Sequence, residues 1–561
     1  MKNEKAMHLI LQSTGEALDL GQQAELSVQL GNPFFREESS YSLPMVLPAT
    51  PRNRRLLGHM QRPDMTGMPA LSCRVELHSL QLAATLRLTA FSDEGFEAAL
   101  TFADFDLMKR AAELRLPDAM AGLTYEAGNG ISGIRGLYAA ATRQAILHDE
   151  DIPWEWFPVF TPDGVLNQVC KGDVDNWWVA VDEREDHDRV VYKPATATDN
   201  NSARPEYDAD PANHLGNTVF LRLEYVLRRV ISQLGYDLTL TTPAFLSASE
   251  QADFAAQWKR LVLLNNTCDA FCPGKIYYDT LVPDISCAEL LQAVETMLGM
   301  HFMVSGNEVR MVFTGDIIST LTPQRELLQE QWTVEYQPLR NLAVSCEHLS
   351  DDGTANTAER APQPALAIRS NTASGRHRPE LPQQDDWTGD AGLQSETLEL
   401  PLADTCMVRC RTAVSGSAVT AATYQAPYLP GWRQLTTTTT ADGSDQTRSA
   451  ALPLVLCYAY GYDYHGAQHL VPYGSPCCST PWLTLYPTAL CKRMLTPYDN
   501  ALQQGMHRYG VQLMLPPADI LQLDFARPVT FRGRRCLIRS VSFAVSDGQT
   551  KVLADFTLEG I

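Results

Sequence analysis

The sequence has no excess of positive charge. Its 561 residues include 45 Lys and Arg against 66 Asp and Glu, which gives a formal net charge of −21. A protein that binds nucleic acid along the phosphate backbone needs a broad basic surface. We therefore expect no specific nucleic-acid binding, whereas an acidic wall that repels DNA would suit a conduit through which DNA slides.

Long hydrophobic runs and an export signal are also missing. No apolar run reaches the roughly 18 residues that a membrane-spanning helix needs. The apolar stretch from Ala6 to Leu11 near the N-terminus is short and contains His8. We expect no membrane insertion and no secretion, so the chain should stay in the cytoplasm in which it is made.

Motifs of the common enzyme families are absent. The sequence contains no GxxxxGK[ST] loop, no GxSxG elbow, no HExxH and no kinase signature. Gly128, Gly130 and Gly133 have the GxGxxG spacing, but no clear strand pattern precedes them, so we expect no nucleotide-binding fold there. We expect no enzymatic activity and assign no catalytic residue. A hydrolase with a carboxylate pair is an open alternative, because the 66 acidic residues give no reason to choose one pair.

The cysteines and histidines do not form a convincing metal site. Thirteen cysteines, an odd number, are scattered along the chain, so we interpret most of them as buried free thiols. A zinc site needs four closely grouped ligands, and we expect no bound metal and no cofactor. Isolated histidines usually lie on the surface or in a satisfied core. The candidate metal ligands are the pairs Cys268/Cys272 and Cys406/Cys410 and the group His465, His469, Cys477 and Cys478. The isolated histidines include His59, His78, His301 and His348.

Length and composition predict several globular domains. At roughly 100–200 residues per domain, the chain has room for three or four, and 45% hydrophobic with 20% charged residues is typical of folded proteins. We divide it into an N-terminal β domain with an extended Pro-rich arm (1–130), an irregular or β insert (131–218), an α+β domain (219–316) and a β-rich C-terminal region with a long polar loop at 350–392 (317–561).

Period-two alternation of apolar and polar residues predicts the N-terminal strands. Between them, Pro44, Pro48 and Pro51 argue against regular structure and favour an extended arm. The predicted strands are 24–30, 73–77, 80–90 and 96–102. In the insert, the acidic run 182–188 lacks the spacing of a calcium loop, so we interpret it as solvated surface.

Helical periodicity appears in the segment 219–316. Apolar residues recur at helical spacing from Phe220 to Leu234, and Gly235 follows at the position of a C-terminal cap. Ser286 and Glu289 have the spacing of a capping box, which predicts a second helix ending at Gly299. The segments HFMV and EVRMVF, joined by a Ser-Gly-Asn turn, then predict a hairpin.

The C-terminal segment returns to a strand pattern. We expect its arginines, together with Ser540, to point largely outward. The predicted core residues are Val529, Phe531, Cys536, Ile538, Val541, Phe543 and Val545, and the predicted outward arginines are Arg532, Arg534, Arg535 and Arg539.

Tryptophans could form a platform for sugar binding, because aromatic faces stack on the apolar surfaces of sugars. The alternative, which we favour, is an aromatic core or a subunit interface. The candidate tryptophans for such a platform are Trp154, Trp156, Trp177, Trp178, Trp432 and Trp482. A carbohydrate-binding receptor or adhesin, of a tail or of a cell surface, is therefore the alternative function.

Several segments together resemble the baseplate-hub and tail-associated structural proteins of bacteriophages, the group typified by the T-even hub, and prophage tail proteins of the Bacteroides type. The resemblance is carried by the NPFF…SYSLPMVLPATPRNRRLLG segment, VFLRLEYVLRRVISQLGYDLTL, LVPDISCAELLQAVETMLGMHFMVSGNEVRMVF and VTFRGRRCLIRSVSFAV…KVLADFTLEG. It covers about half of the chain.

The resemblance implies a self-associating ring, usually a trimer, assembled in the bacterial host cytoplasm and located in the virion tail. Such a ring links the tail tube to a spike or tail-tip protein. The expected fold is mainly β with an α+β segment, and it is multi-domain, with barrel-like β domains plus a small helix-hairpin domain. Many strands with few enzymatic signals suit such a scaffold.

Overall fold

A computed structural model gives the fold of the chain. Some candidate residues of the sequence analysis lie outside those it describes, as do the acidic run 182–188 and most of the loop 350–392. These residues are His78, Trp177, Trp178, Cys406, Cys477, Cys478 and Trp482. The described residues are 7–21, 25–32, 34–35, 41–42, 45–62, 64–65, 70–77, 80–128, 149–157, 159–161, 164–167, 216–305, 307–328, 331–349, 394–405, 407–412, 422–435, 451–458, 487–546 and 550–561, with isolated residues between 133 and 144 and short strands at 192–194, 205–207, 364–368, 438–439, 445–446, 462–465 and 469–472.

Strands from both ends of the chain form one 13-stranded sheet. Its N-terminal half contains β1 (Met7–Leu11), β2 (Glu25–Gly31), β3 (Tyr41–Ser42), β4 (Met45–Leu47), β5 (Ala70–Leu77), β6 (Leu80–Ser92) and β7 (Gly95–Phe102). Its C-terminal half contains β20 (Glu326–Leu327), β21 (Trp332–Glu335), β32 (Arg508–Leu515), β33 (Val529–Phe531), β34 (Arg534–Ser546) and β35 (Val552–Gly560), with the short helix α11 (Pro517–Leu521). The main path runs β1-β5-β6-β7-β3-β2-β34-β35-β32-β21.

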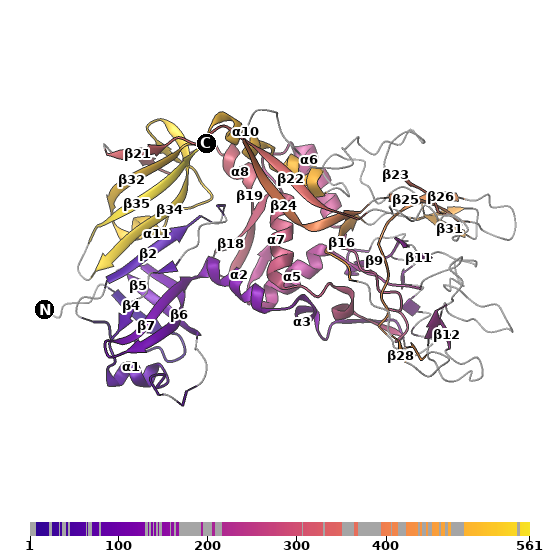
Figure 1. The fold of residues 1–561 in the computed structure, drawn as a ribbon, viewed down its shortest axis with the longest axis horizontal. Coiled ribbons are helices and arrows are strands. Elements are labelled where there is room, and N and C mark those ends of the chain that lie inside the picture. Colours follow the sequence, from indigo (N-terminus) through magenta and orange to yellow (C-terminus); the bar gives the residue numbers. More distant parts are fainter. Residues whose placement is uncertain are drawn as a thin grey trace.

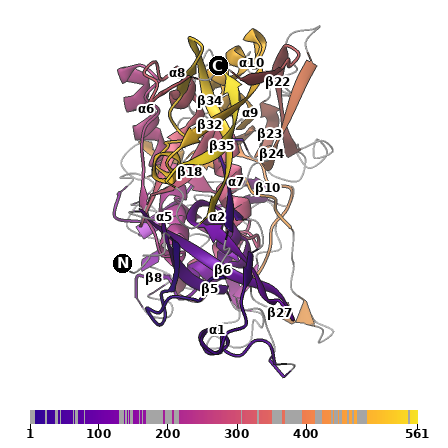
Figure 2. The ribbon, with the colours of Figure 1, turned by 90° about the vertical axis from the view of Figure 1, so that its left-hand side faces the viewer.

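The sheet is one of two bodies in the molecule. In Figure 1 its indigo and yellow halves lie one above the other on the left, and Figure 2 shows them from that side. Buried apolar side chains form one cluster inside the sheet and a second in the rest of the chain. The mainly β, multi-domain fold with an α+β segment is therefore confirmed, while the four domain boundaries stay a prediction.

The strands predicted near the N-terminus are present as β2, β5, β6 and β7. The prediction that the Pro-rich arm lacks regular structure is wrong: strand β4, between Pro44 and Pro48, pairs with β7, and Pro51 begins helix α1 (Pro51–Leu56). Proline is tolerated there because the first turn of a helix has no use for its missing N–H. Thr50 caps this helix by accepting a hydrogen bond from the Asn53 N–H at 3.1 Å.

The C-terminal strands bury all seven predicted core residues. Their spacing changes parity between Ile538 and Val541, and the register shifts at the same place, so a β-bulge takes up the extra residue. That residue, Arg539, was predicted to point outward, which is wrong: its side chain is only 11% exposed, lies against Glu559 and donates to it at 3.0 Å.

The two halves of the sheet join where β2 pairs antiparallel with β34. Asn32, at the end of β2, donates from its backbone N–H to the carbonyl of Arg539 and from its side-chain amide to the carbonyl of Ile538 at 2.7 Å. The same amide donates to the carbonyl of Phe525 at 3.0 Å. A single buried side chain thus holds the bulge and the joint between the two ends of the chain.

The α+β unit follows the sequence prediction closely. Helix α5 (Leu223–Gln233) buries its apolar face and is followed by Gly235 at φ 87°. Helix α7 (Cys287–Leu298) has the complete capping box of Ser286 and Glu289, and the hydrogen bonds from Ser286 lower the pKa of the Glu289 carboxyl. Gly299 ends α7 in the left-handed region at φ 54°. The predicted hairpin is β18 (Met300–Ser305) and β19 (Glu308–Phe313).

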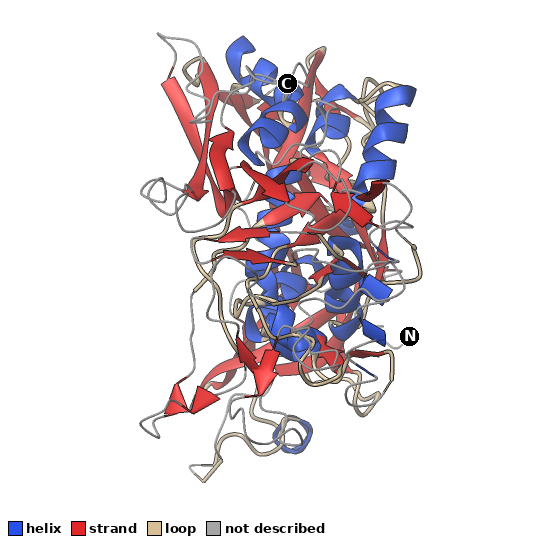
Figure 3. Ribbon diagram, turned by 90° about the vertical axis from the view of Figure 1, so that its right-hand side faces the viewer, coloured by secondary structure: helices blue, strands red, loops and turns tan. Residues whose placement is uncertain are grey.

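Helices surround this hairpin in the centre of the molecule, and short strands lie at the far end (Figure 1). Figure 3 views the molecule from that far end. The central elements are α2 (Ala103–Glu113), α3 (Leu116–Met120), β15 (Asp237–Thr239), α6 (Ala248–Trp258), η2 (Tyr278–Leu281), α8 (Thr314–Ser319), β22 (Arg340–Leu349), β24 (Gln394–Thr405), α9 (Pro487–Met494) and α10 (Thr496–Gln504).

The remaining strands are short. They are β8 (Thr124–Glu126), β9 (Trp154–Glu155), β10 (Val159–Thr161), β11 (Gly164–Leu166), β12 (Tyr192–Pro194), β13 (Pro205–Tyr207), β14 (Phe220–Leu221), β16 (Leu261–Leu263), β17 (Lys275–Tyr277), β23 (Pro364–Ile368), β25 (Met407–Thr412), β26 (Ala422–Pro427), β27 (Thr438–Thr439), β28 (Asp445–Gln446), β29 (Leu456–Tyr458), β30 (Tyr462–His465) and β31 (His469–Pro472). The predicted polar loop 350–392 therefore contains a strand, β23, which pairs with β25.

Replacing Asn32 by alanine should loosen the joint between the two halves of the sheet. The Asn32→Ala variant leaves the carbonyls of Ile538 and Phe525 without these donors, and an unsatisfied buried group costs about 1–3 kcal/mol. We expect the free energy of unfolding to fall by about 2–3 kcal/mol in urea denaturation followed by circular dichroism. The control is Asn307→Ala, at an exposed asparagine with one contact of 3.4 Å. Equal losses in the two variants would contradict this role of Asn32.

Candidate functional site

A pocket of about 510 Å³ lies where the sheet meets the central unit. The elements that contribute to it are the loop after β2, the C-terminal end of α7, strands β18, β22 and β24, helix α10, the bulge of β34 and the ends of β32 and β35. Its lining residues are Phe34, Phe35, Glu295, Thr296, Gly299, Met300, His301, Thr314, Arg340, Leu342, Glu396, Thr397, Leu398, Leu495, Tyr498, Met506, Arg508, Arg539 and Glu559. The pocket is therefore assembled from segments that are far apart in the sequence.

The sheet side of the pocket is built around Glu559 on β35. Its Oε1 accepts from Arg539 at 3.0 Å and from Arg508 at 3.4 Å, and only 3% of the Glu559 side chain is exposed. Arg508 also donates to the exposed Glu335 at 3.2 Å. One buried carboxylate thus compensates two guanidinium groups from neighbouring strands of the sheet.

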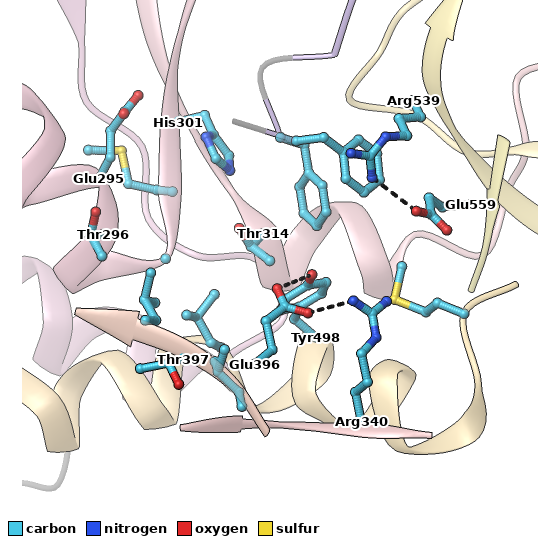
Figure 4. Close-up of a pocket in the computed structure, with 18 of the residues that line it drawn as sticks. Glu295, Thr296, His301, Thr314, Arg340, Glu396, Thr397, Tyr498, Arg539 and Glu559 are labelled. Atoms are coloured by element: carbon cyan, nitrogen blue, oxygen red, sulfur yellow. Dashed lines mark hydrogen bonds and ion pairs between the residues drawn. The ribbon is translucent and has the colours of Figure 1, made fainter. Parts of the chain in front are cut away.

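A second ion pair lies across the pocket on β22 and β24. Arg340 donates to Glu396 at 2.8 Å, and the Tyr498 hydroxyl donates to the other oxygen of Glu396 at 3.2 Å. Figure 4 shows Glu396 between these two partners. Burial, together with the neighbouring Glu396 carboxylate, raises the pKa of Tyr498 well above its ordinary value, so this phenol stays protonated.

Aromatic rings form the remaining wall. Phe34 makes edge contacts with Phe35 at 4.8 Å and with Tyr498 at 5.5 Å between ring centroids, and lies 5.6 Å from the His301 ring. The Arg539 guanidinium lies over the Phe35 ring at 4.9 Å. The pocket therefore combines a flat apolar surface with several hydrogen-bonding groups, which is the usual composition of a small-molecule site.

The site residues are mostly ones that sequence reasoning missed. His301, assigned no role, lies in the pocket wall. Arg508, Arg340 and Glu396 carry no motif, because residues 340, 396 and 508 meet only through the tertiary fold. The change of core parity around Arg539 was the one available signal, since it marks a bulge.

The tryptophan platform is wrong where the structure tests it. Trp154 and Trp156 are buried at 0% and 1% exposure, and Trp432 is buried as well. Trp154 lies on β9, which pairs with β14, so this part of the insert belongs to the core. The predicted alternative of an aromatic core is confirmed for these three tryptophans.

The cysteine interpretation is confirmed for eight cysteines, which form no disulfide among the described residues and are either buried or half-buried. Burial raises the pKa of Cys287 and of Cys536 to about 12, which keeps both thiols protonated. Cys268 donates to the carbonyl of Arg433, and Cys272 lies half-buried nearby. The eight thiols are Cys73, Cys268, Cys272, Cys287, Cys346, Cys457, Cys491 and Cys536.

Within the described parts of the chain, no group of three or more His, Cys, Asp or Glu is arranged to hold a metal ion. His465 and His469 stand opposite each other at the turn end of the β30–β31 hairpin, and Cys477 and Cys478 are outside the described residues. None of the helices described is both long and apolar enough to cross a membrane.

A second feature is the edge strand β21 at the end of the sheet. Apolar side chains on and beside it are exposed, with Leu328 at 74% and Tyr336 at 77%. Trp332 and Leu339 are exposed to a smaller degree. An edge strand with such side chains is a surface onto which another chain can add.

Replacing Glu559 by alanine should destabilise the sheet side of the pocket. The Glu559→Ala variant leaves Arg508 and Arg539 without their shared buried carboxylate, and breaking a buried pair in this way costs about 3–5 kcal/mol. The control is Glu335→Ala, which removes an exposed partner of the same Arg508 and should cost less than about 1 kcal/mol. Urea denaturation measures both, and a small loss for Glu559→Ala would refute the central position of Glu559.

Comparisons with known proteins give structural likenesses only. No family model matches the chain, and no curated protein matches it. Similar solved structures include the 43 kDa tail protein of prophage MuSo2 from Shewanella oneidensis, with 7% identity, a TM-score of 0.34, and coverage of 99% of this chain and 96% of that one. A tail protein from Neisseria meningitidis MC58 has 8% identity and a TM-score of 0.30, covering 99% and 96%. Prophage tail protein gp18 from Listeria monocytogenes EGD-e has 6% identity and a TM-score of 0.33, covering 99% and 94%. At these values the likeness carries no inference about function for this chain.

Proposed function

We propose that the chain is a structural protein of a phage or prophage tail, a baseplate hub that forms a ring. The ring, of three copies or another closed number, links the tail tube to a spike or tail-tip protein. The observation that carries this proposal is a 13-stranded sheet whose two end strands, β1 and β21, are not paired with each other in the described strand order, and whose end strand β21 is exposed. An open sheet of this length is stabilised when its edge is paired or covered.

The two ends of the sheet differ, which favours a head-to-tail contact. At β1 the chain covers its own edge, because Leu18 donates to the carbonyl of Leu9 at 2.8 Å and Leu11 donates to that of Glu16 at 3.0 Å. At β21 the described residues provide no such cover. Copies joined by two different surfaces form a ring when the rotation between them closes.

The face of the sheet opposite its core supports a conduit. Its small or polar side chains include Ser72, Thr85, Ala99, Ser542 and Gln512, and it also exposes the apolar Met514 and Leu553. Its named charges show no basic excess, since it carries Arg74 and Arg87 together with Glu76, Glu97 and Asp555. If this face lines the ring, DNA would meet a polar wall without a basic track to bind it.

No catalytic activity belongs to this proposal, and its partners are further copies of the chain, the tail tube and the spike. The alternative of a carbohydrate-binding receptor loses Trp154, Trp156 and Trp432 as its platform, because they are buried. The location that follows from the proposal is the virion tail, with assembly in the bacterial host cytoplasm.

Charge introduced beside β21 should prevent the ring from forming. We expect the full chain, alone or with its tail-tube and spike proteins, to give a closed ring in multi-angle light scattering and negative-stain imaging. The Leu328→Lys/Tyr336→Lys variant places two charges at exposed positions and should remain a folded monomer.

The control is Leu435→Lys, at an exposed leucine of 38% exposure outside the sheet, which should assemble like the unchanged chain. Monomers under every condition, including with tube and spike present, would overturn the proposed function. A ring that survives the double lysine variant would place the subunit contact away from β21.

A further inference from the structure

The pocket between the sheet and the central unit has a balanced charge. Three arginines, Arg340, Arg508 and Arg539, and three glutamates, Glu295, Glu396 and Glu559, line it. Arg340 pairs with Glu396, Arg508 and Arg539 share Glu559, and Glu295 accepts from the backbone N–H of Phe302 at 2.8 Å. A charged ligand would disturb this balance beside the buried Glu559, so the pocket favours an uncharged one.

Hydrogen-bonding capacity is left over on the same ion pairs. Glu559 Oε2, Arg508 Nε and Arg340 Nε are buried, and none of them has a hydrogen-bond partner among the described residues. Glu559 and Arg508 contact each other at 3.4 Å, so a spare acceptor and a spare donor belong to one pair. A hydroxyl group both donates and accepts, and therefore suits such a pair better than a carboxylate or an ammonium group does.

An aromatic surface lies beside these polar groups. Phe34 is half-buried and is held by the rings of Phe35 and Tyr498. A ring bearing hydroxyl groups on its edge and C–H groups on its face matches both surfaces at once, because the C–H face packs on an aromatic ring while the hydroxyls reach the polar groups.

We propose that this pocket binds a sugar residue through its hydroxyl groups. The volume of about 510 Å³ lies within the roughly 300–1,000 Å³ of small-molecule sites. Arg340 and Arg508 orient the hydroxyls through their Nε–H groups, Glu559 accepts from one of them, and Phe34 packs against the ring. This site contains none of the tryptophans considered as a sugar platform, and it does not depend on ring assembly.

Titration of the full-length protein with uncharged methyl glycosides tests the proposal. Methyl glycosides of glucose, galactose, mannose and N-acetylglucosamine are the probes, and saturation-transfer NMR with calorimetry is the readout. We expect saturable binding of at least one glycoside. Phe34→Ala, which removes the packing surface, should weaken it about five- to tenfold. Arg340→Lys keeps the charge beside Glu396 but removes the Nε–H group, and should weaken binding about tenfold.

The control is Arg325→Lys, the same substitution at an arginine paired with Asp519 outside the pocket, and it should bind like the unchanged chain. Circular dichroism and thermal melting establish that each variant is folded, and Phe34→Ala suffices if Arg340→Lys fails to fold. The proposal is overturned if no glycoside binds saturably, if all variants bind equally, or if only glycine or inorganic phosphate, used as charged competitors, occupies the pocket. Ring assembly is measured separately and is unaffected by either outcome.

Discussion

The pairing of β2 with β34 is the contact on which the rest of the structure depends. It joins residues 25–31 to residues 540–546, so both ends of the chain enter one sheet and everything between them forms a second body attached to it. The entropy of closing so long a loop grows only with the logarithm of its length. Burial of Val28, Leu30, Val541 and Phe543 along the joint offsets it.

The same joint positions the candidate site. The bulge in β34 turns Arg539 away from the outer face and toward Glu559, and Asn32 holds the bulge from β2. Phe34 and Phe35 follow directly after Asn32 and form the aromatic wall. Because the other wall of the pocket belongs to the central unit, the shape of the pocket depends on how the sheet and the central unit pack against each other. A ligand there and a ring built on the sheet would therefore act on connected parts of one structure.

Local signals explain why some elements could be predicted residue by residue. Helix α7 was predicted with both its boundaries, because the capping box of Ser286 and Glu289 and the left-handed Gly299 act within a few residues of the helix. The buried face of α5 and the β18–β19 hairpin followed in the same way from periodicity and turn residues. Pro51 was misjudged because proline is compatible both with an extended arm and with the first turn of a helix. Only the capping contact between Thr50 and Asn53 distinguishes the helix from the arm.

By itself the sequence determined the mainly β class, the helices of the α+β unit and the alternating core of the C-terminal strands, since periodicity and capping depend on neighbours along the chain. Only the tertiary structure decided that the two ends share a sheet, that Trp154 and Trp156 are core, and that Arg340, Glu396, Arg508 and Glu559 line one pocket. Strand pairing and ion pairing between residues hundreds of positions apart depend on which surfaces pack together, and local sequence patterns do not predict such contacts.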